Sequence, residues 1–225
     1  DKPLIGRLNV ESIWCFGHFR ENYDANLGFS RVFDISEELG SSFEDGDLRK
    51  VTAFMIIPDI VRPFVATPLQ QQKVQFYSSA ADNRSNSWRT SEAYLNRAEA
   101  LIQKYRAGDA GAAAEALASL NTLRQHRYDA NAYQPWVLQP ADVLLRMCRE
   151  ERRRELFYEG HRWFDLRRYG MPAIRHKYYP TLGVLETYTL EKGDIQYVVP
   201  IPNEVLQRNP ALLPNPQRAA RRNAD

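Results

Sequence analysis

Cysteine and histidine are scarce in this sequence, and no long apolar run interrupts it. The two cysteines, Cys15 and Cys148, allow at most one disulfide bond, so a disulfide framework does not hold the fold together. The four histidines lack the short spacings that place ligands around a metal ion. A membrane-spanning helix needs roughly 18 consecutive apolar residues, and the sequence contains no such run. We therefore expect no metal site and no transmembrane helix within these 225 residues.

An excess of charge of one sign is also missing. Lysine and arginine number 30 against 28 aspartates and glutamates, and a formal net charge of +2 gives little attraction to nucleic acid or to an anionic membrane. The sequence contains no phosphate-binding loop, dinucleotide fingerprint or nucleophile elbow. We expect no cofactor, no enzymatic activity and no nucleic-acid partner.

No charged and then apolar signal segment opens the chain, which begins at Asp1 without a methionine. We expect it to be a processed or truncated part of a longer protein. With 44% hydrophobic residues, it can bury a sizeable core as one domain or as part of a larger one. Aromatic residues are plentiful, with 12 tyrosines, 10 phenylalanines and 4 tryptophans. Such amphipathic rings occur on sugar-binding surfaces as well as in cores.

Helical periodicity dominates the middle of the chain. Apolar residues recur every three or four positions over 89–105 and again over 112–127, which predicts two helices joined by a turn at Gly108 and Asp109. Alanines on both predicted helices allow close packing, so the pair resembles one tetratricopeptide unit. Because a single unit cannot cover its own apolar faces, we expect the helix predicted over 144–158 to stack on it.

Acidic residues share the apolar stripe of this third helix. At 100° per residue, Glu151, Glu155 and Glu159 fall on one helical face with the apolar residues. Burying an unpaired carboxylate costs several kcal/mol, so each glutamate is expected to meet an arginine. The predicted ion-pair network comprises Glu151, Glu155, Glu159, Arg124, Arg162, Asp165 and Arg168.

Two functional interpretations compete with this structural one. Carboxylates held close together can form an acid–base site, but surrounding arginines keep them ionised. The arginines could instead form a nucleic-acid surface, but six acidic residues interrupt them. We favour the ion-pair network, with Gly160 ending the helix in a left-handed conformation and residues 162–168 forming a short further helix.

The C-terminal signature of the SusD/RagB-like outer-membrane lipoproteins resembles one stretch of this chain, Glu151-Arg152-Arg153-x-Glu155-Leu156-x-x-Glu159-Gly160-x-Arg162-x-x-Asp165-Leu166-x-Arg168. These proteins are the surface glycan-binding partners of TonB-dependent transporters. Further motifs extend the resemblance from about Asp47 to Pro216, including the Asp47-x-Arg49 element and the closing Ile-Pro, Asn-Pro and Asn-Pro series. The resemblance implies that the signature residues belong to the scaffold and not to a ligand site.

The resemblance implies a mainly α, SusD-like α/α fold. A tetratricopeptide-like helical pair and the packed signature helix form its centre, with irregular loops and short β-hairpins at the periphery. Residues 1–225 would be the C-terminal portion of one SusD-like domain. We divide them into a strand- and loop-rich segment (1–88), a helical core (89–170), a hairpin and closing segment (171–217) and a tail (218–225).

Two loops carry the candidate ligand-binding residues. The polar loop over 20–28 holds Asn22, Tyr23 and Asn26, and the proline-bounded loop over 128–140 holds Tyr133 and Trp136. Rings and amides on loops can stack on and hydrogen-bond to a sugar. Structural alternatives remain open: Tyr23 could tether a solvent loop, and Trp136 could staple its loop onto the helices.

Shorter elements are predicted around this core. We expect a strand over 10–19 with a break at Gly17, short edge strands over 51–65, and a loop over 70–86. Turn residues 191–194 predict a hairpin between strands 186–190 and 195–199.

The function implied by the resemblance is non-catalytic binding of an oligo- or polysaccharide at the cell surface. The parent protein would be lipid-anchored in the outer membrane and would deliver its ligand to a SusC-like TonB-dependent transporter. Any membrane attachment would come only from a lipid anchor absent from this chain. A peptide-binding family member and a helical-repeat adaptor for a protein partner remain alternatives, and a glycosidase built on the glutamates is the least favoured.

Overall fold

The computed structural model describes residues 10–16, 36–52, 54–56, 71–73, 86–157, 159–181 and 184–216. The chain divides into two compact units. Unit 1 comprises Asp1–Pro58 and Pro68–Gly160, and unit 2 comprises Asp59–Thr67 and His161–Asp225. The described part of the chain is mainly helical, as predicted.

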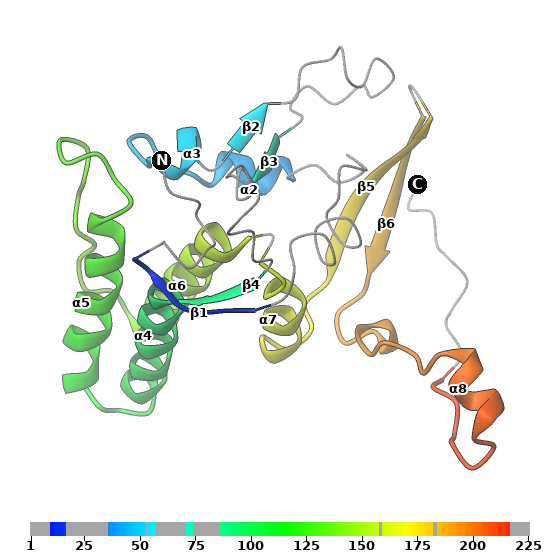
Figure 1. The fold of residues 1–225 in the computed structure, drawn as a ribbon. Helices are drawn as coiled ribbons and strands as arrows, with labels where there is room; N and C mark the ends of the chain where they lie inside the picture. The colour runs from blue at the N-terminus through cyan, green and yellow to red at the C-terminus, as the bar shows by residue number, and fades with distance from the viewer. Residues whose placement is uncertain are drawn as a thin grey trace. The chain divides into compact units, whose positions relative to one another are not determined.

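Three helices form the centre of unit 1. They are α4 (Thr90–Arg106), α5 (Gly111–Gln125) and α6 (Ala141–Leu156). Helix α4 packs against both of the others, and a turn at 107–110 joins it to α5 (Figure 1). The predicted pair of helices and the third helix stacked on it are therefore confirmed, with ends shifted by a few residues.

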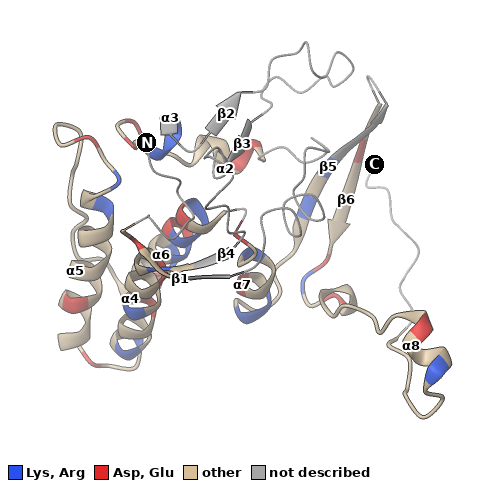
Figure 2. Cartoon of the chain, viewed as in Figure 1, with Lys and Arg blue, Asp and Glu red and all other residues tan. Residues whose placement is uncertain are grey.

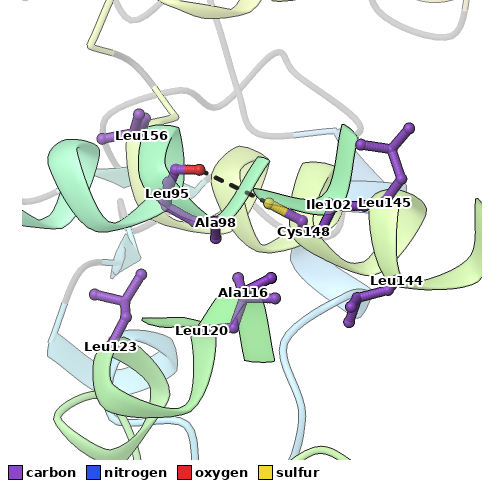
Figure 3. Close-up of a cluster of buried hydrophobic side chains, with 10 residues drawn as sticks. All are labelled: Leu95, Ala98, Ile102, Ala116, Leu120, Leu123, Leu144, Leu145, Cys148 and Leu156. Carbon is purple, nitrogen blue, oxygen red and sulfur yellow. Dashed lines mark hydrogen bonds between the residues drawn. The ribbon is translucent and has the colours of Figure 1, made fainter. Parts of the chain in front are cut away.

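The core of unit 1 lies between these helices (Figure 3). Its apolar residues follow the periodicity of the sequence, because positions three and four apart share one face of a helix. Two small residues, Ala98 on α4 and Ala116 on α5, are fully buried and let the helices approach closely. The buried core cluster comprises Leu95, Ala98, Ile102, Ala116, Leu120, Leu123, Leu144, Leu145, Cys148 and Leu156.

Two small antiparallel sheets complete unit 1, each of two strands. Strand β1 (Ser12–Phe16) pairs with β4 (Asn86–Arg89), and β2 (Phe54–Ile56) pairs with β3 (Gln71–Lys73). The loop prediction over 70–86 is wrong at both of its ends. Strand β3 is entirely polar and shows no alternation, so only its pairing with β2 makes it a strand.

The turn between α2 (Glu37–Ser41) and α3 (Arg49–Thr52) lies against the loop that follows α5. Asp47 pairs with Tyr128 in an isolated β-bridge, and the backbone N–H of Asp129 donates to the carbonyl of Gly46 at 2.9 Å. Gly46 has a φ of +81°, in the left-handed region that favours glycine. This turn carries Arg49 into the interior, where it is buried.

The first described helix of unit 2 is α7 (Arg162–Arg168), which has the predicted bounds. A long hairpin of β5 (Ile174–Thr181) and β6 (Val184–Leu190) follows, and then the 3-10 helix η3 (Ile195–Tyr197) and α8 (Asn203–Arg208). Tyr197 is fully buried, and its ring stacks on Trp163 at 4.9 Å between centroids.

The hairpin predicted between 186–190 and 195–199 is wrong. Strand β6 contains the first of these segments, but it pairs with β5, which precedes it in the chain. The side chain of Asp194 accepts from the backbone N–H of Gln196 at 2.8 Å and so caps η3. Gly193 donates its backbone N–H to the carbonyl of Met171 at 2.8 Å. The turn residues therefore begin a helical turn where a returning strand was predicted.

Candidate functional site

The glutamates of the signature helix are buried. Glu151 and Glu155 lie on α6, and Glu159 follows the end of the helix, where Gly160 adopts a φ of +81°. The exposed fraction of Glu151 is 0%, and the side chains of the other two are exposed by less than a twentieth. Acidic and basic residues both lie along α6 (Figure 2). Periodicity thus directs carboxylates into the interior, where water cannot solvate them.

Three arginines surround the carboxylate of Glu151. Arg49 Nη2 lies 2.8 Å from its Oε1, an ion pair without good hydrogen-bond alignment. Arg154 Nη2 and Arg124 Nη1 donate to the other oxygen at 2.7 Å and 3.2 Å. These arginines come from α3, α6 and α5, so the carboxylate joins three helices.

Glu155 also contacts three arginines. Arg49 Nη1 donates to its Oε2 at 2.9 Å, Arg89 Nη1 donates to its Oε1 at 3.0 Å, and Arg127 donates to both oxygens at 2.9 Å. Glu159 receives two parallel bonds from Arg89, at 2.7 Å and 3.0 Å. This bidentate geometry is the strongest form of the pair.

The same arginines extend the network to the ends of two other elements. Arg127 Nη2 lies 2.8 Å from Glu11, which immediately precedes β1, and Arg89 Nη1 lies 3.2 Å from the same carboxylate. Arg49 forms a two-point pair with Asp47, at 2.7 Å and 3.0 Å. The network therefore ties β1, β4 and the α3 turn to the helical core.

The electrostatic surroundings oppose acid–base chemistry here. Burial alone would raise the pKa of Glu151, but the positive charges of Arg49, Arg154 and Arg124 outweigh it and lower that pKa. Burial alone would also raise the pKa of Glu155, but the neighbouring guanidinium groups hold that pKa well below the ordinary value. A general acid needs a raised pKa, so these carboxylates are suited to structure and not to proton transfer.

The remaining predicted members of the network lie in unit 2. Arg168 Nε donates to Asp165 Oδ1 at 2.9 Å within α7, and Asp165 is buried. Arg162 is an exposed residue at the start of the same helix. Four arginines that contact the buried glutamates were not among the predicted members: Arg49, Arg89, Arg127 and Arg154. Arg49 belongs to the Asp47-x-Arg49 element of the resemblance, and Arg89 immediately precedes α4.

The loop 128–140 uses its aromatic residues against α5. The guanidinium of Arg124 lies 3.9 Å from the ring centroid of Trp136, and Asn121 exchanges two hydrogen bonds of 2.8 Å and 2.9 Å with the backbone of that residue. The hydroxyl of Tyr133 donates to the carbonyl of Asn121 at 3.1 Å. Both side chains are half-buried. These contacts favour the staple interpretation of Trp136, since one face of its ring is covered.

The other candidate ligand-binding residues, Asn22, Tyr23 and Asn26, lie outside the described residues. The structure instead presents an aromatic pair that the sequence did not single out. Trp14 on β1 and Trp88 on β4 are opposed across the sheet, with 5.1 Å between ring centroids and 60° between ring planes. They are 55% and 54% exposed.

In the described part of the chain, histidine, cysteine, aspartate and glutamate side chains form no group of three that could hold a metal ion. Among the described helices, none is both long and apolar enough to span a membrane. Cys148 is a buried free thiol whose Sγ lies 3.9 Å from the carbonyl oxygen of Leu95 (Figure 3).

Comparison with known proteins places these features in a family. The family model of the SusD family matches residues 62–217, more than half of the chain. A SusD-like carbohydrate binding protein from Bacteroides vulgatus ATCC 8482 is 22% identical with a TM-score of 0.45. A SusD-like protein from Bacteroides fragilis NCTC 9343 is 18% identical, also with a TM-score of 0.45.

These two matches cover 71% and 65% of this chain, but 33% and 30% of the solved chains. The chain thus spans about a third of the length of the solved relatives. No curated protein matches the sequence. The match to the family model includes the whole signature stretch, and the resemblance drawn from that stretch is confirmed. The chain belongs to the SusD family.

Proposed function

We propose that the protein of which this chain is part binds carbohydrate at the cell surface and passes it, chemically unchanged, to a TonB-dependent outer-membrane transporter. Family membership carries this proposal, since the SusD model matches most of the chain. One solved relative is described as a carbohydrate binding protein. Exposed and half-buried aromatic side chains in unit 1 provide the kind of surface on which sugar rings stack.

Membership of this family supports the expectation that the protein is not an enzyme. The surroundings of Glu151 and Glu155 agree with this expectation. Glycoside hydrolysis uses two carboxyl groups, one of them an acid with a raised pKa. Glu151 and Glu155 have lowered pKa values, and arginines occupy their oxygens. These surroundings argue against a glycosidase built on these glutamates.

The partner and the location belong to the same proposal. A SusC-like transporter would receive the ligand, and the protein would reside on the outer membrane through a lipid anchor. Co-purification of the full-length protein with an outer-membrane transporter from its native membrane would support this assignment. Purification without any such transporter from the same membrane, after mild solubilisation, would contradict delivery while leaving carbohydrate binding intact.

Carbohydrate binding is tested by calorimetric titration of the full-length protein. The probes are soluble plant, host and microbial polysaccharides, with a mixture of oligopeptides titrated in parallel. We expect saturable heat with at least one polysaccharide and none with the peptides. Saturable binding of peptides alone would replace the proposal by the peptide-binding alternative. Unchanged polysaccharide after prolonged incubation with the protein would confirm that no hydrolysis accompanies binding.

A further inference from the structure

Apolar side chains are exposed in the part of unit 2 around α8, residues 195–216, which we call the α8 region. Only two side chains of this region carry a charge, Glu204 and Arg208, so the region is neutral overall. Six large apolar residues of the region are between 37% and 86% exposed: Ile195, Val198, Val199, Val205, Leu212 and Leu213. Exposed apolar surface that is gathered in one place marks an interaction site more often than scattered apolar residues do.

Hydrogen bonds fix the α8 region in place. The backbone N–H of Ile201 donates to Asn215 Oδ1 at 2.8 Å, which joins the two ends of the loop that carries α8. Before this loop, Tyr197 is buried and its hydroxyl donates to the carbonyl of Pro172. An apolar surface on so constrained a segment loses little conformational entropy when a partner binds to it.

The outer face of α8 combines an exposed valine with two opposite charges. At 100° per residue, Glu204, Val205 and Arg208 lie within 100° of one another, and the half-buried Leu206 lies on the other side. Figure 2 shows the acidic and the basic residue on this helix. Within the described part of the chain, neither charged side chain has an ion-pair or hydrogen-bond partner, although their spacing would allow a pair within the helix.

A second copy of α8 would supply both missing partners. In a contact with twofold symmetry, residue i of one copy meets residue j of the other, and residue j meets residue i. Two antiparallel copies of α8 therefore place Glu204 of each copy opposite Arg208 of the other, with the valines between the two charge pairs. The neutral α8 region offers no comparable attraction to an anionic lipid surface or to a polyanion.

From this geometry we propose that the α8 region is a self-association surface, through which two copies of the protein pair about a twofold axis. The six apolar side chains expose about as much surface as three complete ones, on the order of 300 Å². Because about two thirds of a homodimer interface is apolar, the interface would occupy roughly 500 Å² on each copy. Interfaces of this size are small, so the dimer is reversible and forms at high protein concentration.

This inference concerns assembly and goes beyond the proposed carbohydrate function. A dimer would present two copies of the protein to one repeating polymer, which raises the apparent affinity without any new contact. Self-association is measured without carbohydrate, so a negative result would leave carbohydrate binding as it stands.

The test is sedimentation velocity of the purified protein from about 1 µM to about 300 µM. We expect the sedimentation coefficient to rise with concentration from that of a monomer toward that of a dimer. Glu204→Arg and Arg208→Glu each place like charges opposite one another twice, so each should weaken the dimer by about tenfold or more. The matched control is Glu150→Arg, which reverses an exposed charge on α6 and should leave the dimer unchanged.

A mixture of the two single variants provides the decisive measurement. In a mixed pair, the reversed charge at position 204 of one copy meets the reversed charge at position 208 of the other. The native Arg208 of the first copy likewise meets the native Glu204 of the second. We therefore expect the equimolar mixture to dimerise although neither variant does so alone, and the double variant Glu204→Arg/Arg208→Glu to dimerise by itself. Recovery in the mixture also shows that both variants are folded.

Each outcome decides for or against the surface. Loss of the dimer in the single variants with recovery in the mixture and in the double variant supports it. A wild-type protein that remains monomeric over the whole concentration range overturns it, including where the α8 region is found to bind a different protein. A dimer that survives both single reversals shows that another surface carries the association. Loss in the single variants without recovery in the mixture overturns the antiparallel pairing.

Discussion

The carboxylate of Glu151 has no exposed surface, and three guanidinium groups surround it. A charge this deep is tolerated only because its partners are charged and close. The tolerance is mutual, since Arg49 and Arg124 are themselves buried. Removing any one of these residues would leave the remaining charges buried without a partner. This penalty, more than the attraction between the charges, makes each residue necessary.

Glu151→Gln tests this dependence. Glutamine keeps the shape of the side chain but leaves three arginines facing a neutral group in the interior. We expect the free energy of unfolding to fall by about 3 kcal/mol or more, measured by denaturant titration. The control is Glu115→Gln, which breaks an exposed ion pair with Arg97 and should cost less than about 1 kcal/mol. Similar losses in the two variants would show that burial does not amplify the effect.

The same carboxylates predict how stability depends on pH. The folded-state pKa values of Glu151 and Glu155 lie below 4.5, so the unfolded chain takes up protons first as the pH falls. Their stabilisation is complete above about pH 4.5 and is lost as the pH falls through the folded-state pKa values.

We expect the free energy of unfolding to be nearly constant from about pH 7 to about pH 5 and to decrease below about pH 4.5. Glu155→Gln should show a shallower decrease, because one titrating carboxylate is gone. Urea titrations at a series of pH values measure both slopes. An equally steep decrease in this variant would assign the acid sensitivity to other carboxylates.

At the scale of elements, short connections decide where the helices end and which segments meet. Gly46 and Gly160 both have a φ of +81°, but their surroundings differ. A Cβ on Gly160 would meet nothing within 4 Å, whereas a Cβ on Gly46 would overlap that of Ala132. Gly46 is thus needed for the close approach of two loops as well as for its own conformation.

Alanine at these two glycines separates backbone strain from steric overlap. Gly160→Ala should destabilise by about 1 to 2 kcal/mol, since only the left-handed conformation opposes it. Gly46→Ala should cost about 3 kcal/mol or more, because overlap adds to the same strain. The double variant Gly46→Ala/Ala132→Gly should return to the cost of Gly160→Ala, measured by thermal unfolding. No recovery in the double variant would mean that Ala132 is not the obstacle.

At the scale of the whole molecule, the described residues form two compact units, and the large apolar core lies in unit 1. Cys148 is enclosed in that core between α4 and α6. Its thiol can reach solvent only when the packing of these helices opens. The chain spans about a third of the length of its solved relatives.

Thiol reactivity therefore reports opening of the core. In a Cys15→Ser background, Cys148 should not react with Ellman's reagent under native conditions and should react in parallel with denaturant unfolding. The control adds Thr122→Cys, an exposed position on α5, which should react at once in the folded protein. Rapid native reaction of Cys148 would contradict the tight packing of α4 on α6.

Local patterns were sufficient for the helical part of the fold. Periodicity located α4, α5 and α6, and the turn and helix signals located Gly160 and α7, because these features depend on residues within a few positions of one another. Periodicity also directed Glu151 and Glu155 inward. It did not identify Arg49 as a partner, since that residue is 106 positions from Glu155 and no local pattern connects them.

The strands show more strongly that local patterns do not predict contacts between remote segments. The turn signal at 191–194 predicted a hairpin, but β6 pairs with the strand before it. Trp14 and Trp88 received no functional weight, because their exposure depends on a bulge in the register of two strands more than 70 residues apart. Trp136 could be a platform or a staple by sequence, and the position of Arg124 over its ring favours the staple.

The sequence by itself determined a helical core, an inward-facing acidic stripe and the family, since each of these is written in residue spacing along one segment. Only the tertiary structure decided which arginines neutralise the stripe, which strands pair and which indoles reach the surface. The physical reason is range: helical hydrogen bonds and side-chain faces repeat within a few residues, whereas ion pairs and strand registers join segments that are remote in the chain.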